Sequence, residues 1–107
     1  MSLGNKTEVL RLAEMVGYET DSIVSRSIAK SDFGNVTLFA LDAGQELSPH
    51  TTTSDALAHV LEGEAEITVN DRATLVRPGE AIILPAGVPH AVKAPMQCKM
   101  LLTMMRV

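Results

Sequence analysis

Residues 44–63 read GQELSPHTTTSDALAHVLEG, and this stretch decides the fold. Its two ends are glycines, which suit tight turns because glycine adopts backbone angles that other residues avoid. The first half is polar, whereas residues 56–61 are apolar except for His59. Such an apolar run is typical of a strand that is covered on both faces. The positions of interest in this first motif are Gly44, His50, Thr52, Ala56 and Gly63.

A second motif, GEAIILPAGVPHAVKA, occupies residues 79–94. Its Pro-Ala-Gly sequence favours a turn between two short apolar runs. Between the two motifs, Asn70-Asp71 favours a hairpin. The positions of interest in the second motif are Gly79, Pro85, Gly87, His90 and Ala94.

Short runs of β type, separated by turn residues, extend on both sides of these motifs. In residues 65–69, apolar and polar residues alternate, as they do in a strand with one inward face. Eight such runs are too many for one flat sheet in 107 residues, so they indicate a closed or doubly layered antiparallel barrel. The predicted strands are 22–29, 35–42, 56–61, 65–69, 73–76, 81–84, 88–92 and 98–105.

Before the strands, the sequence predicts one short helix. Within residues 5–8, a capping asparagine precedes a glutamate by three positions, and apolar residues then recur at helical spacing. We expect this helix to end near Gly17. Its apolar positions are Val9, Leu12, Ala13 and Val16.

Together, the two motifs resemble the paired motifs of the cupin superfamily, in its small conserved-barrel form known as cupin 2 or RmlC-like. The resemblance covers residues 44–94 and includes the glycines and prolines of the family pattern. It implies an all-β fold, a double-stranded β-helix or jelly-roll barrel, with the short helix in front. We expect a single domain, residues 1–107, whose core barrel spans about residues 22–107.

The resemblance also suggests where a metal would bind. In metal-binding cupins, the first motif supplies two histidines and a glutamate, and the second motif supplies one more histidine. Here His50 and His90 match ligand positions, but Thr52 and Ala56 stand where the other histidine and the glutamate would be. Two neutral imidazoles hold a catalytic divalent ion poorly, because such sites usually have three protein ligands. The first motif is therefore degenerate as a metal site.

His59 is the remaining candidate for a third imidazole ligand beside His50 and His90. Strand alternation argues against it, because residue 59 faces the side of the strand opposite to residues 56, 58 and 60. A bulge between Thr53 and Leu57 would reverse that orientation. The cofactor is therefore either a divalent transition metal (Zn, Fe, Ni, Mn or Cu) or none.

These residues leave three functions open. The leading hypothesis is a stand-alone barrel that binds a small molecule in an apolar pocket, with His50 and His90 orienting it and Thr52 adding a hydroxyl. The second is a metal-dependent enzyme of dioxygenase or isomerase type, which needs His59 or another side chain to complete its site. The third is a non-catalytic sensor or interaction module. The sequence is consistent both with an enzyme and with a protein that only binds its ligand.

Composition indicates which binding partners and which cellular compartment to expect. The net charge of −4, without a cluster of Lys or Arg, argues against a nucleic-acid surface, so we expect no DNA or RNA partner. No apolar run is long enough to span a membrane. The single cysteine, Cys98, fits a reducing compartment, so we expect a cytoplasmic protein. We also expect a homodimer, because the two-sided apolar strand around Val60 needs a second cover.

Overall fold

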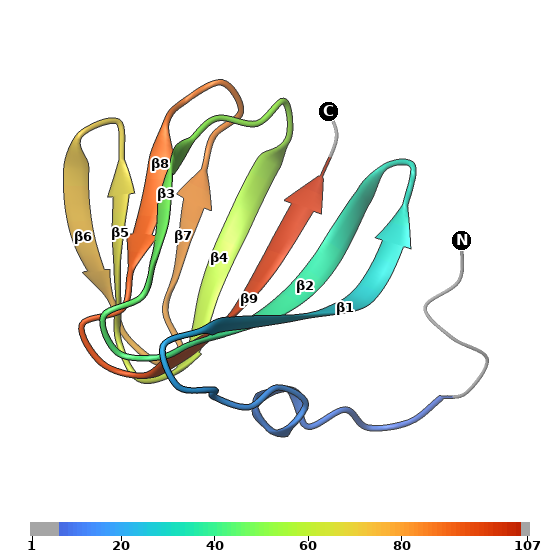
Figure 1. The fold of residues 1–107 in the computed structure, drawn as a ribbon. Coiled ribbons are helices and arrows are strands. Elements are labelled where there is room, and N and C mark those ends of the chain that lie inside the picture. Colours follow the sequence, from blue (N-terminus) through green and yellow to red (C-terminus); the bar gives the residue numbers. More distant parts are fainter. Residues whose placement is uncertain (1–6, 106–107) are drawn as a thin grey trace.

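Antiparallel strands make up most of residues 7–105, the part of the chain described in this computed structural model. They form two sheets that face each other (Figure 1). The five-stranded sheet has the order β1-β2-β9-β4-β7, and the four-stranded sheet has the order β3-β8-β5-β6. The strands are β1 (Ile23–Ser31), β2 (Gly34–Leu41), β3 (Glu46–His50), β4 (Asp55–Glu62), β5 (Ala65–Val69), β6 (Arg72–Val76), β7 (Ala81–Leu84), β8 (His90–Lys93) and β9 (Cys98–Met105).

This architecture confirms the predicted all-β barrel, and each of the eight predicted runs overlaps a strand. The prediction lacks β3, which is polar and contains Pro49. A proline cannot donate a hydrogen bond to a sheet, so its presence argues against a central strand. β3 lies at an edge of the four-stranded sheet, where a missing donor is tolerated.

The predicted N-terminal helix is wrong. Within residues 7–105 the structure has only one 3₁₀ turn, η1 (Leu12–Glu14), and the predicted capping residue Asn5 lies outside the described residues. A helix this short is marginal by itself, so packing decides the conformation. Here residues 12–18, which we call the strap, lie across the outer face of the five-stranded sheet, where Val16 packs with Leu38. No helix among residues 7–105 is long and apolar enough to cross a membrane.

Polar contacts hold the strap against the sheet. The Tyr18 hydroxyl donates a 2.6 Å hydrogen bond to Glu62 Oε2. Lys99 Nζ lies 3.6 Å from the same carboxylate oxygen and donates to the carbonyl oxygen of Ala13. Burial and the Glu62 carboxylate both raise the pKa of Tyr18, so the phenol keeps its proton as the donor in this contact.

The core lies between the two sheets and is aliphatic. Its fully buried side chains include Ile67 from the four-stranded sheet and Val60 and Met100 from the five-stranded sheet. Cys98 is buried in the same cluster, and burial raises the pKa of its thiol to about 11. This thiol is therefore protonated at neutral pH and packs as a small apolar side chain.

The strand around Val60, which was predicted to be covered on both faces, is covered unevenly. Ala58 and Val60 point into the core. Leu61, on the outer side, packs against the cluster that the strap forms with the sheet. Leu57, further along the outer side of β4, is 39% exposed. Among the described residues, the strap thus supplies part of the cover that this strand needs and leaves Leu57 partly exposed.

Gly63, which ends the first motif, provides a direct test of the fold. Its φ of +70° is one that only glycine adopts easily. A Cβ atom here would overlap the carbonyl oxygen of Gln97 and lie 2.9 Å from the Cα of Cys98. Gly79 has a similar φ of +85°, but a Cβ there would meet open space.

We therefore expect Gly63→Ala to lower the free energy of unfolding by about 3 kcal/mol, since backbone strain and a backbone clash add. Gly79→Ala has only the backbone strain and should cost about 1 kcal/mol. Urea denaturation of both variants measures the difference. Equal losses in the two variants would contradict the close approach of Gly63 to β9.

Candidate functional site: a histidine pair at the mouth of the barrel

An irregularity in β3 places His50. Leu47 pairs with Val92 of β8, and the next registered pair is His50 with His90, so two residues of β3 oppose the single Ala91. Leu47 and Val92 both pack in the core, which defines the inward face. Strict alternation would turn a residue three positions after Leu47 outward. The extra residue of the bulge reverses this and turns His50 inward.

His90 is inward because of its place in β8. It lies two residues before the core residue Val92, so the two side chains share a face. On its other side, His90 pairs with Val69 of β5, which also packs against the core. His90 is only 5% exposed, whereas His50 on the edge strand is exposed.

Two loops next to the histidines are tied together. The backbone N–H of Gly87 donates a 2.8 Å hydrogen bond to the carbonyl oxygen of Thr52. The N–H of Ala86 donates, also over 2.8 Å, to Asp55 Oδ1. One loop follows His50 and the other precedes His90. These bonds therefore fix the two loop ends from which the histidines project.

The two imidazole rings meet edge to face, with centroids 4.3 Å apart and planes at 69°. His50 Nδ1 lies 2.8 Å from the carbonyl oxygen of Ser48, and His90 Nδ1 lies 3.3 Å from that of Val88. A carbonyl oxygen only accepts hydrogen bonds, so each Nδ1 carries the proton in the neutral ring. Each Nε2 then has a lone pair, and neither has a partner among residues 7–105.

The surroundings keep His90 neutral. Burial lowers its pKa below the ordinary value of 6.5, and the charge of a protonated His50 lowers it further. The carbonyl oxygen of Val88 acts in the opposite direction, because it stabilises the protonated ring. The net lowering means that His90 presents a neutral acceptor at physiological pH.

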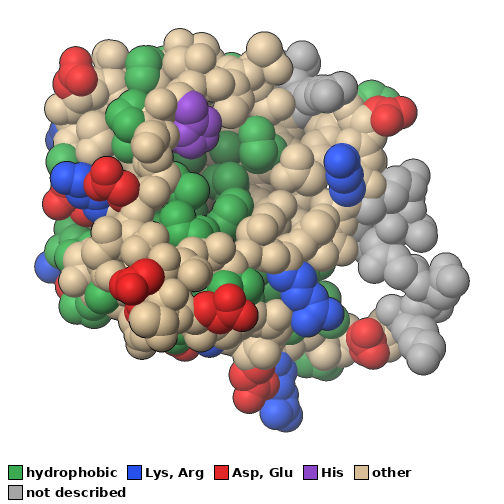
Figure 2. Space-filling view, viewed as in Figure 1, with side chains coloured by type: hydrophobic (Ala, Val, Ile, Leu, Met, Phe, Trp, Pro, Cys, Tyr) green, Lys and Arg blue, Asp and Glu red, His purple; other side chains and the backbone are tan. Residues whose placement is uncertain are grey.

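The side of the mouth opposite the pair is uncharged, and the charged inward position near the pair is the exposed Arg72 of β6, which is in register with Val69 beside His90. The mouth-facing ends of β2, β4 and β9 bring inward Asn35, Ala56 and Met104, which lie in register with one another. Thr37, the next inward residue of β2, donates a 3.4 Å hydrogen bond to Asn35 Oδ1. Figure 2 shows a hollow with a floor of hydrophobic side chains and a histidine at its rim. Asn35 and Thr37 are not among the predicted site residues, although the alternation in 35–42 could have placed them inward.

Thr52, the third predicted ligand-binding residue, has a structural contact. Its hydroxyl donates a 2.8 Å hydrogen bond to the carbonyl oxygen of Ser54 in the same loop. The hydroxyl proton is therefore not free to bind a ligand. The hydroxyl oxygen still has a lone pair with which to accept a hydrogen bond. In ligand binding, Thr52 can therefore only accept a hydrogen bond.

His59 is not brought to the pair. It lies in register with Leu101 and Ala81, and pairing with β9 is regular from Asp55 to Val60. The irregularity in β4 comes only after Val60, too late to turn His59 inward. Among residues 7–105, no cluster of three or more His, Cys, Asp or Glu side chains could hold a metal. The alternative of a three-histidine centre with His59 is therefore not formed among these residues.

The donor set at the mouth does not fit a resident catalytic metal. It consists of two imidazoles, and the two other ligand positions implied by the family pattern carry Thr52 and Ala56. An alanine has no donor atom, and a neutral threonine hydroxyl is a weak ligand beside imidazole or carboxylate. A divalent ion here would lack the three protein ligands that hold catalytic metals.

Comparison with known proteins identifies the family. The profile described as "Cupin domain" matches residues 37–104, more than half of the chain. A conserved protein of unknown function from Streptococcus pyogenes is 35% identical, with a TM-score of 0.91 over 99% of this chain and 93% of that one. A cupin superfamily protein from Desulfitobacterium hafniense is 26% identical, with a TM-score of 0.90 over 99% and 97% of the two chains.

An uncharacterized protein of Streptomyces coelicolor is also similar in sequence. It is 41% identical over 56 residues, which are 52% of this chain and 53% of that protein. The chain thus covers about half the length of this curated relative.

The lowered pKa of His90 predicts how stability depends on pH. Between that pKa and 6.5, the unfolded chain binds more protons at this residue than the native protein does. Stability therefore falls as the pH drops through this range, and the residue has no such effect above it. We expect the acid loss of unfolding free energy, measured with urea, to be smaller in His90→Gln than in the wild type.

His59→Gln is the matched control, because it removes a histidine outside the barrel and leaves His90 in place. It should keep the wild-type dependence on pH. If His90→Gln and His59→Gln show the same slope as the wild type, burial of a neutral His90 is contradicted.

Proposed function

This chain belongs to the cupin family, and we propose that it binds a small uncharged molecule through Nε2 of His50 and Nε2 of His90. The observation that carries this proposal is the use of both Nδ1 atoms on backbone carbonyl oxygens. That arrangement leaves two neighbouring nitrogen acceptors at the mouth of the barrel. A complementary ligand therefore has a hydrogen-bond donor, such as an O–H or N–H group.

The walls support an uncharged, largely apolar ligand. The inward positions of β2, β4, β8 and β9 carry no Asp, Glu, Lys or Arg among the described residues. A charged ligand buried against these four strands would lose its hydration without gaining an opposite charge, which is costly. Arg72 of β6 is also at an inward position of the mouth, but it is exposed and keeps its own hydration. An apolar body with one donor group meets the hydrophobic floor and the two acceptors together.

The metal-dependent alternative has less support. It requires a third ligand, and His59 lies on the outer side of β4. The proposal therefore assigns the imidazoles to the ligand directly, without a metal between them. A sensor or interaction module whose histidines bind nothing is the competing outcome of the experiment below.

Phenol and anisole make a matched pair of probes. Phenol combines an apolar ring with one O–H donor, whereas anisole keeps the ring and lacks the donor. We expect phenol, and not anisole, to shift the ring signals of His50 and His90 in NMR spectra, since only phenol can donate to Nε2. His59, outside the barrel, serves as the internal control.

The variants His50→Ala and His59→Ala complete the design. Titration of phenol should give a dissociation constant at least about tenfold weaker in His50→Ala, consistent with loss of one hydrogen bond to a ligand. His59→Ala should bind as the wild type does. Equal shifts with phenol and anisole, or shifts at His59 as large as those at the pair, would refute recognition by the two acceptors.

A further inference from the structure

β2 and β3 lie opposite each other across the interior of the barrel. Each strand of the four-stranded sheet is joined to one strand of the other sheet by a short connection, and these connections are residues 42–45, 63–64, 77–80 and 94–97. They lie together at the end of the barrel away from the mouth (Figure 1). The first of them joins β2 to β3, so β2 supplies the wall opposite His50.

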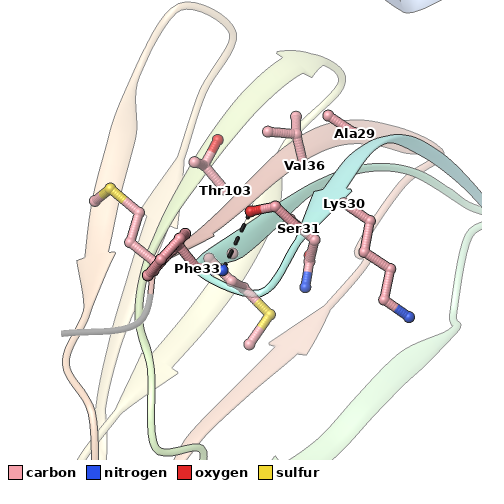
Figure 3. A pocket seen from close by; sticks show the side chains of 10 residues that line it. Ala29, Lys30, Ser31, Phe33, Val36 and Thr103 are labelled. Carbon is pink, nitrogen blue, oxygen red and sulfur yellow. Dashed lines mark hydrogen bonds between the residues drawn. The ribbon is translucent and has the colours of Figure 1, made fainter. Parts of the chain in front are cut away.

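Asn35 is the inward residue of β2 nearest to the mouth. Phe39 packs against the core between the sheets, and Thr37 and Asn35 continue the same face of the strand by alternation. On the other face of the sheet, Val36 lies with Thr103 along one side of an outer hollow (Figure 3). The side chain of Asn35 therefore belongs to the inner wall and not to the outer surface.

The turn before Asn35 fixes its position. The backbone N–H of Phe33 donates a 3.1 Å hydrogen bond to Ser31 Oγ in the turn between β1 and β2 (Figure 3). Gly34 then passes so close to β9 that a Cβ atom there would overlap the carbonyl oxygen of Met104. These contacts hold the first residues of β2 against β9, so Asn35 has a defined place in the wall.

The amide of Asn35 offers donors on the wall opposite the two histidine acceptors. Its Oδ1 accepts a 3.4 Å hydrogen bond from the Thr37 hydroxyl. This contact directs the amide nitrogen away from Thr37, and Nδ2 has no hydrogen-bond partner among residues 7–105. Asn35 is half-buried beside Met104, so its N–H groups are partly removed from water. A half-buried donor without a partner favours a ligand that brings an acceptor.

The charge next to Asn35 also favours an acceptor. Lys30 of β1 is in register with Asn35 and is exposed. None of the four connections places a strand of the other sheet opposite β1, so Lys30 lies at the rim, outside the paired walls. Its positive charge attracts the partial negative charge of a carbonyl oxygen and disfavours a second donor at this end of a ligand.

We propose that Asn35 is a specificity-determining residue for the ligand of the histidine pair, and that this ligand is an uncharged hydroxy carbonyl compound. Its hydroxyl group donates to Nε2 of His50 or His90, and its carbonyl oxygen accepts from Nδ2 of Asn35. The apolar body between the two groups lies over the hydrophobic floor of the mouth. This inference rests on the proposed function and adds a second point of recognition to it.

Raspberry ketone and para-butylphenol are a matched pair of probes. Both are phenols with a four-carbon side chain, and only the ketone has an acceptor at the far end. In NMR spectra, we expect both compounds to shift the ring signals of His50 and His90, and only the ketone to shift the side-chain amide signals of Asn35. The amide of Gln97 is the internal control, because it lies in a connection away from the mouth and donates to Asp42 Oδ1.

The variant Asn35→Ala measures what the amide contributes to binding. It should raise the dissociation constant of the ketone, relative to that of para-butylphenol, at least about fivefold, because one hydrogen bond to the ligand is lost. Using the ratio cancels the different hydrophobicity of the two side chains. Thr68→Ala is the matched control, because Thr68 follows the core residue Ile67 in β5 and faces outward. It should leave the ratio at the wild-type value.

The outcomes separate this inference from the proposed function. If both compounds shift the histidine signals but Asn35→Ala leaves the ratio unchanged, the proposed function stands and the role of Asn35 is overturned. A shift of the Gln97 amide as large as that of Asn35 would overturn it as well. If neither compound shifts the histidine signals, the proposed function fails, and this inference fails with it.

Discussion

The candidate site depends on a β-bulge in the edge strand β3. Between Leu47 and His50, two residues of β3 lie opposite one residue of β8. Without the bulge, His50 would face outward, and His90 would be a single buried imidazole. With it, the two rings lie with centroids 4.3 Å apart at the mouth of the barrel. The contacts from Gly87 to Thr52 and from Ala86 to Asp55 then hold the neighbouring loops in place.

The chemistry of the pair follows from the backbone around it. Each Nδ1 is bound by the carbonyl oxygen two residues earlier, which is Ser48 for His50 and Val88 for His90. These short-range contacts turn both imidazoles into acceptors at Nε2. In metal-binding cupins such acceptors would serve as metal ligands. In this chain, Thr52 and Ala56 remove the remaining donors, so a ligand with its own donor group suits the site better.

Much of the fold could be predicted from the sequence, because it depends on local signals. Alternation and turn residues located eight strands, and the spacing of the two motifs located both histidines. β3 was not predicted because its Pro49 is unusual in a strand. This edge strand forms by pairing with β8, which is distant in the chain. The N-terminal helix failed for a related reason. Its apolar residues pack on a sheet surface that only the folded barrel provides.

The site was less predictable than the fold. Strand alternation correctly argued that His59 faces away from the barrel interior, because β4 is regular up to Val60. The sequence gives no comparable signal for the tautomers of His50 and His90, since these depend on the approach of particular carbonyl oxygens. The inward placement of Asn35 and Thr37 beside the mouth likewise required the register of β2 with β9.

The most direct measurement of this account is the tautomeric state of the two histidines in the free protein. Long-range ¹H–¹⁵N correlation spectra near pH 7.5 distinguish a protonated ring nitrogen from an unprotonated one. We expect Nδ1 to be protonated and Nε2 to be unprotonated in both His50 and His90. A proton on Nε2 of either ring would contradict it, because the mouth would then lack its pair of acceptors.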